Sequence, residues 1–119
     1  GLGVIHAASH PIGAVYNTHH GTTNAVVMQE SLILNKPAIE KKIEILCNYL
    51  EIQDGFEGFI SFVANLNSEL NIPKSLTELG VKNPNIKDLV VSALSDPSCG
   101  SNPIKLTTEN MTRLFENCL

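Results

Sequence analysis

The chain has 119 residues, a length that suits one ordinary domain and is too short for two. Its net charge is −4, and 17% of its residues are charged. The negative charge argues against a nucleic-acid partner, which would require a basic stripe, and no apolar run approaches the roughly 18 residues of a membrane span. The cysteines, Cys47, Cys99 and Cys118, are odd in number and widely spaced, which favours reduced thiols in a cytoplasmic protein.

The first predicted helix covers residues 3–16. Its apolar residues recur at helical spacing on one face, while His6 and His10 lie four residues apart on another. Pro11 lacks an amide donor and is expected to kink this helix or to loosen its first turn. Asn17 and Thr18 mark a break before the next helix.

Three longer helices are predicted in the middle of the chain. The first begins near His20 and ends at Asn35, and because it is apolar on several sides we expect it to be the central buried helix. Pro37 then takes the first position of another helix, since proline is favoured there. The third is marked by residues 59–70. In the second of these three helices the apolar residues at helical spacing are Ile39, Ile43, Leu46, Cys47 and Leu50. In the third they are Phe59, Phe62, Val63, Leu66 and Leu70.

Shorter helices are predicted in the last third. Ser75 and Glu78 have the spacing of a capping box, and Gly80 supplies a C-terminal stop. A helix over residues 86–94 and a polar loop over 96–103 precede a last helix capped by Thr107 or Thr108. The residues this last helix is expected to bury are Met111, Leu114, Phe115 and Cys118. No stretch alternates with period two over a useful length, so the sequence predicts an all-α bundle of about six to seven helices.

All four histidines lie within the first 21 residues, and no lysine or arginine precedes Lys36. On a helix, His6 and His10 would have Cβ atoms roughly 5–6 Å apart, so both rings could reach one metal ion. His20 follows the predicted break, which could return the chain against the first helix. The spacing is neither that of a zinc finger nor His-Glu-x-x-His. From the residues alone, the cluster is either a metal site or a set of ordinary surface and core histidines. The first carboxylate is Glu30, so a carboxylate ligand would have to come from elsewhere.

The histidine stretch also has a family likeness. Residues 1–14, Gly-Leu-Gly-Val-Ile-His-Ala-Ala-Ser-His-Pro-Ile-Gly-Ala, and 19–25, His-His-Gly-Thr-Thr-Asn-Ala, resemble the signature of the iron-containing (group III) alcohol dehydrogenases. The resemblance continues in residues 71–76, 78–81 and 100–103 and so extends over essentially the whole chain. It implies the C-terminal helical domain of that family, on the scaffold shared with glycerol dehydrogenases and dehydroquinate synthases, which fit the motif less well.

The resemblance implies a role for each histidine. His6 and His20 match the two family histidines that bind the divalent metal, Fe(II) or sometimes Zn(II). His10 matches the histidine beside the metal, near the nicotinamide ring and the substrate, which makes it the expected catalytic and cofactor-contacting residue. The other family ligands, an Asp and a His, and the Gly-rich segment that binds NAD(P) lie upstream of the residues that this chain matches.

The sequence departs from the family pattern at two positions. His19 stands where the family has proline, and we expect it to be exposed and not a ligand. Ile104 follows Asn102-Pro103 where the family has arginine, so any role of that arginine is lost. Cys99 lies in a loop similar to one near the family's substrate cavity and is a further site residue to be considered.

The resemblance therefore implies one metal-binding helical domain over residues 1–119, cut from a longer two-domain dehydrogenase that interconverts an alcohol with an aldehyde or ketone. Its partners would be the missing N-terminal NAD(P)-binding domain and a small alcohol or aldehyde. We expect the isolated chain to be inactive. The alternative is a non-catalytic helical module for assembly or interaction. Without the partner domain, exposed apolar surface would favour a homo-oligomer, which a strictly monomeric elution profile would contradict.

Overall fold

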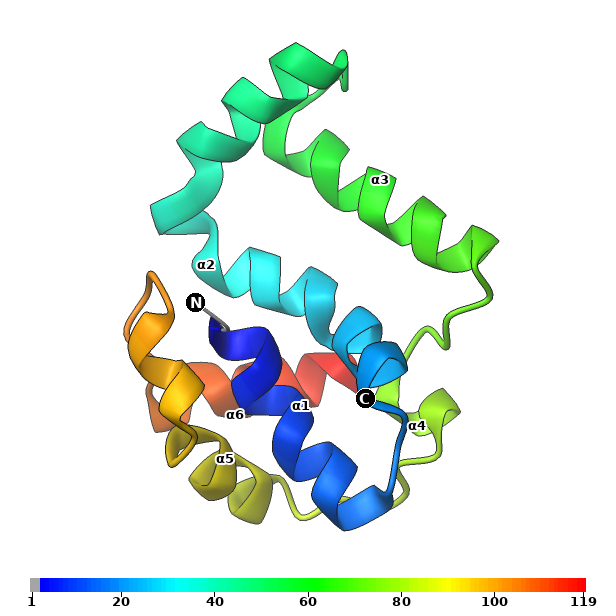
Figure 1. Cartoon of the computed structure of the whole chain (residues 1–119), viewed down its shortest axis with the longest axis vertical. Coiled ribbons are helices and arrows are strands. Elements are labelled where there is room, and N and C mark those ends of the chain that lie inside the picture. The colour runs from blue at the N-terminus through cyan, green and yellow to red at the C-terminus, as the bar shows by residue number, and fades with distance from the viewer. Residues whose placement is uncertain (1–2) are drawn as a thin grey trace.

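The computed structural model describes residues 3–119, which form helices and connecting loops without any strand (Figure 1). The all-α prediction is confirmed. Gly1 and Leu2, the first two residues of the family-like motif, lie outside the described residues. The elements are α1 (Gly3–Tyr16), α2 (His20–Leu50), α3 (Gly55–Glu69), α4 (Leu76–Leu79), α5 (Ile86–Leu94), the 3₁₀ helix η1 (Pro97–Ser101) and α6 (Thr108–Cys118).

α1 packs against α2, α5 and η1 and lies at the centre of the lower part of Figure 1. Its buried residues include Val4, Ala8 and Ile12, which join the main core cluster. The helix runs on through Pro11, which is buried, to Tyr16. Asn17 then adopts a left-handed conformation with φ of 54° and ends it, at the break that the sequence predicted.

α6, at the opposite end of the sequence from α1, also contributes buried residues to the core. Met111, Leu114, Phe115 and Cys118 are at most 4% exposed, as the apolar spacing predicted. Thr107 caps this helix in a reciprocal capping box with Asn110, so the predicted start is also confirmed. α4 is capped by Ser75 and ended by Gly80 at φ of 114°, which glycine adopts without steric cost.

The predicted division at residues 35–37 is wrong. α2 is continuous over His20–Leu50, and Pro37 lies inside it instead of starting a new helix. Proline removes one intrahelical hydrogen bond and clashes with the carbonyl four residues earlier, so a helix that continues past it bends. Figure 1 shows α2 changing direction part-way along its length. The half before the bend packs on α1 and the half after it runs beside α3, so tertiary contacts on both sides keep the helix intact.

The second half of α2 and α3 form a helical hairpin that projects from the core (Figure 1). Burial there is less than the apolar pattern led us to expect. Cys47, Phe56 and Val63 are buried, whereas Leu50 is 51% and Leu70 62% exposed. Of the described elements, α3 packs mainly on α2, and the end of α3 returns to the first half of α2, where Asn67 Nδ2 donates to the Ala25 carbonyl at 3.1 Å. None of the helices in residues 3–119 combines the length and apolar character needed to cross a membrane.

Cys118 gives the core a measurable dependence on alkaline pH. Burial, followed by the negative charge of Glu30, raises the pKa of this thiol from 9.0 to about 12. In the unfolded chain the thiol loses its proton near its ordinary pKa. Between these two values the unfolded state therefore binds fewer protons than the folded state, and stability falls as the pH rises.

We expect this group to lower the free energy of unfolding by roughly 1.4 kcal/mol for each pH unit within that window. Urea unfolding at about pH 8 and about pH 10.5 measures the slope, and Cys118→Ala is the control because it cannot titrate. A variant whose stability falls as steeply as that of the wild type would contradict the prediction.

Candidate metal centre

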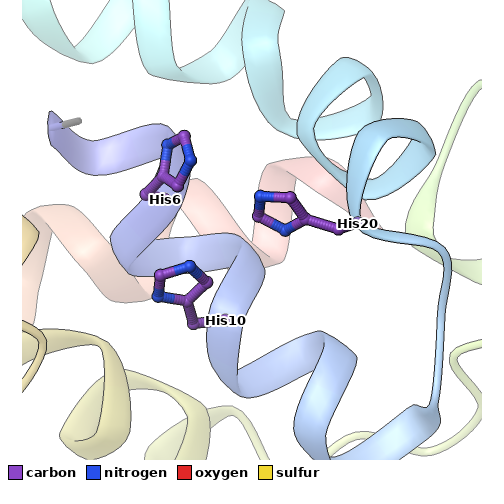
Figure 2. A group of neighbouring side chains, drawn as sticks. All are labelled: His6, His10 and His20. Carbon is purple, nitrogen blue, oxygen red and sulfur yellow. The ribbon is translucent and has the colours of Figure 1, made fainter.

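The structure brings three of the four histidines together in the space between α1 and the start of α2 (Figure 2). The ring centroids of His6 and His10 lie 5.4 Å apart, those of His6 and His20 5.1 Å, and those of His10 and His20 5.4 Å. One ring nitrogen from each residue lies within 4.8 Å of the other two. The residues that the sequence grouped as a cluster are therefore close enough to bind one ligand.

Local structure explains why His20 meets the other two. His6 and His10 are one turn apart on α1, so their rings lie on the same face, with an interplanar angle of 84°. The turn over residues 17–19 reverses the chain, and His20 is the first residue of α2. Thr23 fixes this start, because its hydroxyl donates to the His19 carbonyl at 2.8 Å and bonds the Thr18 hydroxyl at 2.6 Å.

The start of α1 is held by residues from the other end of the chain. Asn102 Oδ1 accepts from the Val4 amide at 3.1 Å, and Ser101 Oγ accepts from the Gly3 amide at 3.1 Å. The side chains of Asn102 and Asn35 exchange two hydrogen bonds of 2.7 and 3.0 Å. Asn102 thus joins the first turn of α1, which precedes His6, to the middle of α2.

Asp96 is the carboxylate that reaches the histidines. Its Oδ2 lies 2.6 Å from His10 Nδ1, although 86 residues separate them in sequence. Burial raises the pKa of Asp96, but hydrogen bonds from His10 and Ser98 outweigh that effect and lower the pKa below its ordinary value. Glu30, the first carboxylate in the sequence, instead lies against Asn117 at 3.4 Å.

The residues present fit a divalent cation. Three imidazoles supply neutral nitrogen donors of the kind that Fe(II) and Zn(II) accept. Atoms at the corners of a triangle with 4.8 Å sides lie roughly 2.8 Å from its centre, against about 2.0–2.1 Å for an imidazole–zinc bond. Small ring rotations would close that difference. Asn24 Oδ1, one turn after His20, is also buried without a hydrogen-bond partner, and an unsatisfied acceptor of this kind is costly in a dry core.

His19, Cys99 and Ile104 take no part in the histidine cluster. His19 is exposed, as expected, and its Nδ1 caps α2 by accepting weakly from the Thr22 amide at 3.4 Å. Cys99 donates its thiol hydrogen to the Ala93 carbonyl and borders a surface hollow lined by Leu94, Gly100, Asn102, Lys105 and Leu106. Ile104 contributes its carbonyl to Asn102.

Asp96 and Asn102 are the site residues that sequence reasoning missed. The loop over 96–103 was recognised as polar, and Asp96 before Pro97-Ser98 is a typical N-cap signal. That signal marks a turn, but it does not reveal which distant side chain the second carboxylate oxygen meets.

Comparison with known proteins shows which family the chain belongs to. The family model described as "Fe-containing alcohol dehydrogenase family, C-terminal" matches residues 1–119. The chain belongs to this family. Its match to the iron-containing alcohol dehydrogenases confirms the resemblance seen in the histidine motif.

Relatives and solved structures of this family cover nearly all of the chain. Lactaldehyde reductase of Escherichia coli (strain K12) is 30% identical over 97% of it, and alcohol dehydrogenase 4 of Saccharomyces cerevisiae (strain S288c) is 32% identical over 97%. A crystal structure of a 1,3-propanediol oxidoreductase superposes with a TM-score of 0.89 at 27% identity and covers 98% of the chain. The chain spans only 32%, 31% and 32% of these three proteins, respectively, and corresponds to their C-terminal region.

Proposed function

We propose that this chain supplies the C-terminal half of the metal centre of an NAD(P)-dependent alcohol dehydrogenase. In this proposal His6 and His20 bind a divalent metal, Fe(II) or Zn(II), and His10 stands beside it, facing the nicotinamide and the substrate. The observation that carries the proposal is the convergence of three histidine nitrogens within 4.8 Å of one another from two different helices. Membership of the iron-containing alcohol dehydrogenase family supports it.

The rest of the proposed site lies outside these residues. The resemblance implies an Asp and a His as further ligands and a Gly-rich NAD(P)-binding segment, all in a domain that would be the partner of this one. The substrate class that we propose is a small alcohol or its aldehyde or ketone. Two of the relatives carry names of that kind, lactaldehyde reductase and alcohol dehydrogenase 4.

A bound divalent metal would supply Lewis acidity, which favours loss of the alcohol proton and hydride transfer to the nicotinamide. The chain's own residues would bind the metal and fix the orientation of the rings around it. His6 and His20 offer neutral nitrogens from helices that the core and Asn102 keep in place. His10 is exposed and has Asp96 as a carboxylate partner, so it can present one ring nitrogen to a neighbouring group.

Metal titration of the purified chain tests this proposal. Anaerobic titration with Co(II), whose absorption reports imidazole coordination, is expected to show saturable binding of one ion per chain. An assay of NAD-dependent alcohol oxidation with the same sample is expected to show none, because in this proposal another domain would supply the dinucleotide site. The absence of saturable Co(II) binding at millimolar concentration, or clear dehydrogenase activity of this chain alone, would contradict the proposal.

Two further expectations remain part of the proposal. The exposed apolar side chains of the α2–α3 hairpin, such as Leu50 and Leu70, support association of this chain with itself or with another domain. All three cysteines are free, which agrees with the expected cytoplasmic location.

A further inference from the structure

The contact between His10 and Asp96 differs from an ordinary surface pair. Nδ1 of His10 and Oδ2 of Asp96 are 2.6 Å apart, and the side chain of Asp96 is only 12% exposed, whereas that of His10 is 46% exposed. A short contact to a charged acceptor is among the stronger hydrogen bonds in proteins. The geometry therefore places a nearly buried acceptor against one defined nitrogen of an accessible ring.

The backbone holds Asp96 in place. Its second oxygen, Oδ1, accepts from the Ser98 amide at 2.8 Å and so caps η1. Its own amide donates to the Ala93 carbonyl at 3.1 Å, and its carbonyl accepts from the Cys99 amide at 3.1 Å. Because both carboxylate oxygens are occupied and the main chain is tied on either side, Oδ2 cannot turn away from His10 without breaking the cap.

The chemistry of the two groups decides which nitrogen carries the proton. An ionised carboxylate only accepts hydrogen bonds, and the lowered pKa of Asp96 keeps it ionised near neutral pH. Nδ1 of His10 must then be the donor. In the neutral ring the lone pair is left on Nε2, at the far edge of the ring from Asp96. Figure 2 shows one ring nitrogen of His10 directed toward His6 and His20 and the other away from them.

We propose that Asp96 is a positioning residue, which fixes His10 in the Nδ1-protonated tautomer and turns the free Nε2 toward His6 and His20. Its place in the site rests on the proposed function, but the tautomer itself does not and can be measured without metal. Carboxylate partners of this kind set the tautomer and orientation of histidines elsewhere in proteins. No other charged side chain hydrogen-bonds His10 in residues 3–119.

Asp96→Asn tests the proposal because the change inverts one hydrogen bond and conserves the rest. The asparagine carbonyl oxygen can still cap Ser98, so its amide nitrogen then faces His10 as a donor. His10 must respond by accepting at Nδ1, which moves the proton to Nε2. Asp54→Asn is the matched control, since Asp54 is exposed, makes no side-chain cap and has a φ of 68° that asparagine tolerates.

The measurement is long-range ¹H–¹⁵N correlation NMR of the histidine rings in the metal-free chain at alkaline pH, where imidazole is neutral. We expect the Nδ1–H tautomer for His10 in the wild type and in Asp54→Asn, and the Nε2–H tautomer in Asp96→Asn. Because His10 is expected beside the metal and not as a ligand, we expect Co(II) affinity to fall in Asp96→Asn by less than the roughly tenfold expected for His10→Ala.

A wild-type His10 in the Nε2–H form, or the same tautomer in the wild type and in a folded Asp96→Asn, would overturn the proposal. The wild-type spectrum is decisive even if the variant does not fold. Failure of the wild type to bind Co(II) would count against the proposed function and leave the tautomer result standing, so the two failures are distinguishable.

Discussion

Replacing His6 or His20 by alanine is expected to lower the affinity of the chain for Zn(II) or Co(II) by about 100-fold or more. Each change removes one of the two histidine nitrogens proposed to bind the metal. Loss of a factor of 100 corresponds to about 2.8 kcal/mol of binding free energy. The predicted roles also differ, because His10 is expected beside the metal and His10→Ala should cost only about tenfold.

Anaerobic titrations of the three variants against one competing chelator give these affinities on one scale. His19→Asn is the matched control, since His19 lies next to the site, outside the cluster, and asparagine can keep the N-cap of α2. We expect it to bind metal as the wild type does. A large loss for His19→Asn together with no loss for His20→Ala would mean that the two neighbours have been assigned the wrong way round. A loss at His10 as large as at His6 would make all three histidines ligands.

Replacing Phe115 by alanine is expected to lower the free energy of unfolding by roughly 3–5 kcal/mol. Phe115 is 0% exposed and lies in the core cluster with Val4, Ala8 and Ile12 of α1, the helix that carries two of the histidines. Truncation leaves a cavity that the surrounding helices fill incompletely. Domains of this size are stable by only about 5–15 kcal/mol, so a large fraction of the stability would be lost.

Urea unfolding followed by circular dichroism measures this loss, and Phe62→Ala is the control because that ring is 47% exposed on α3. The control should lose under about 1 kcal/mol. If both variants lost the same amount, the division of the molecule into a packed core and a projecting hairpin would be wrong. A Phe115→Ala chain that remains partly folded should also bind metal more weakly, because α1 rests on this core.

Local signals predicted much of the fold. The apolar spacing of α6 and its Thr107 cap, the Ser75 cap of α4, and the stop at Gly80 each depend on residues within a few positions of one another. The meeting of His6 with His10 is of the same kind, since one helical turn brings them together. The position of His20 required only a tight reversal after Tyr16.

The remaining features depend on contacts that no short window contains. The sequence predicts a helix start at Pro37 because proline is favoured at the first position of a helix. In the structure, packing on α1 and α3 keeps α2 continuous through Pro37. The exposure of Leu50 and Leu70 follows from which segments cover the hairpin. Asp96 meets His10 across 86 residues, and Asn102 meets Asn35 across 67, so neither pair leaves a local pattern.

The long span of the hydrogen bonds around α1 has a consequence for how a metal would be acquired. Gly3 and Val4 are held by Ser101 and Asn102, each 98 residues away, so the first helix reaches its final position only when the end of the chain has docked. Contacts of such range form late and slow down folding. A chain shortened before Ser101 would lack both acceptors, so the three imidazoles would not be held at the spacing that a metal ion requires. Once loaded, the ion would stabilise the folded state by mass action and protect it from reopening.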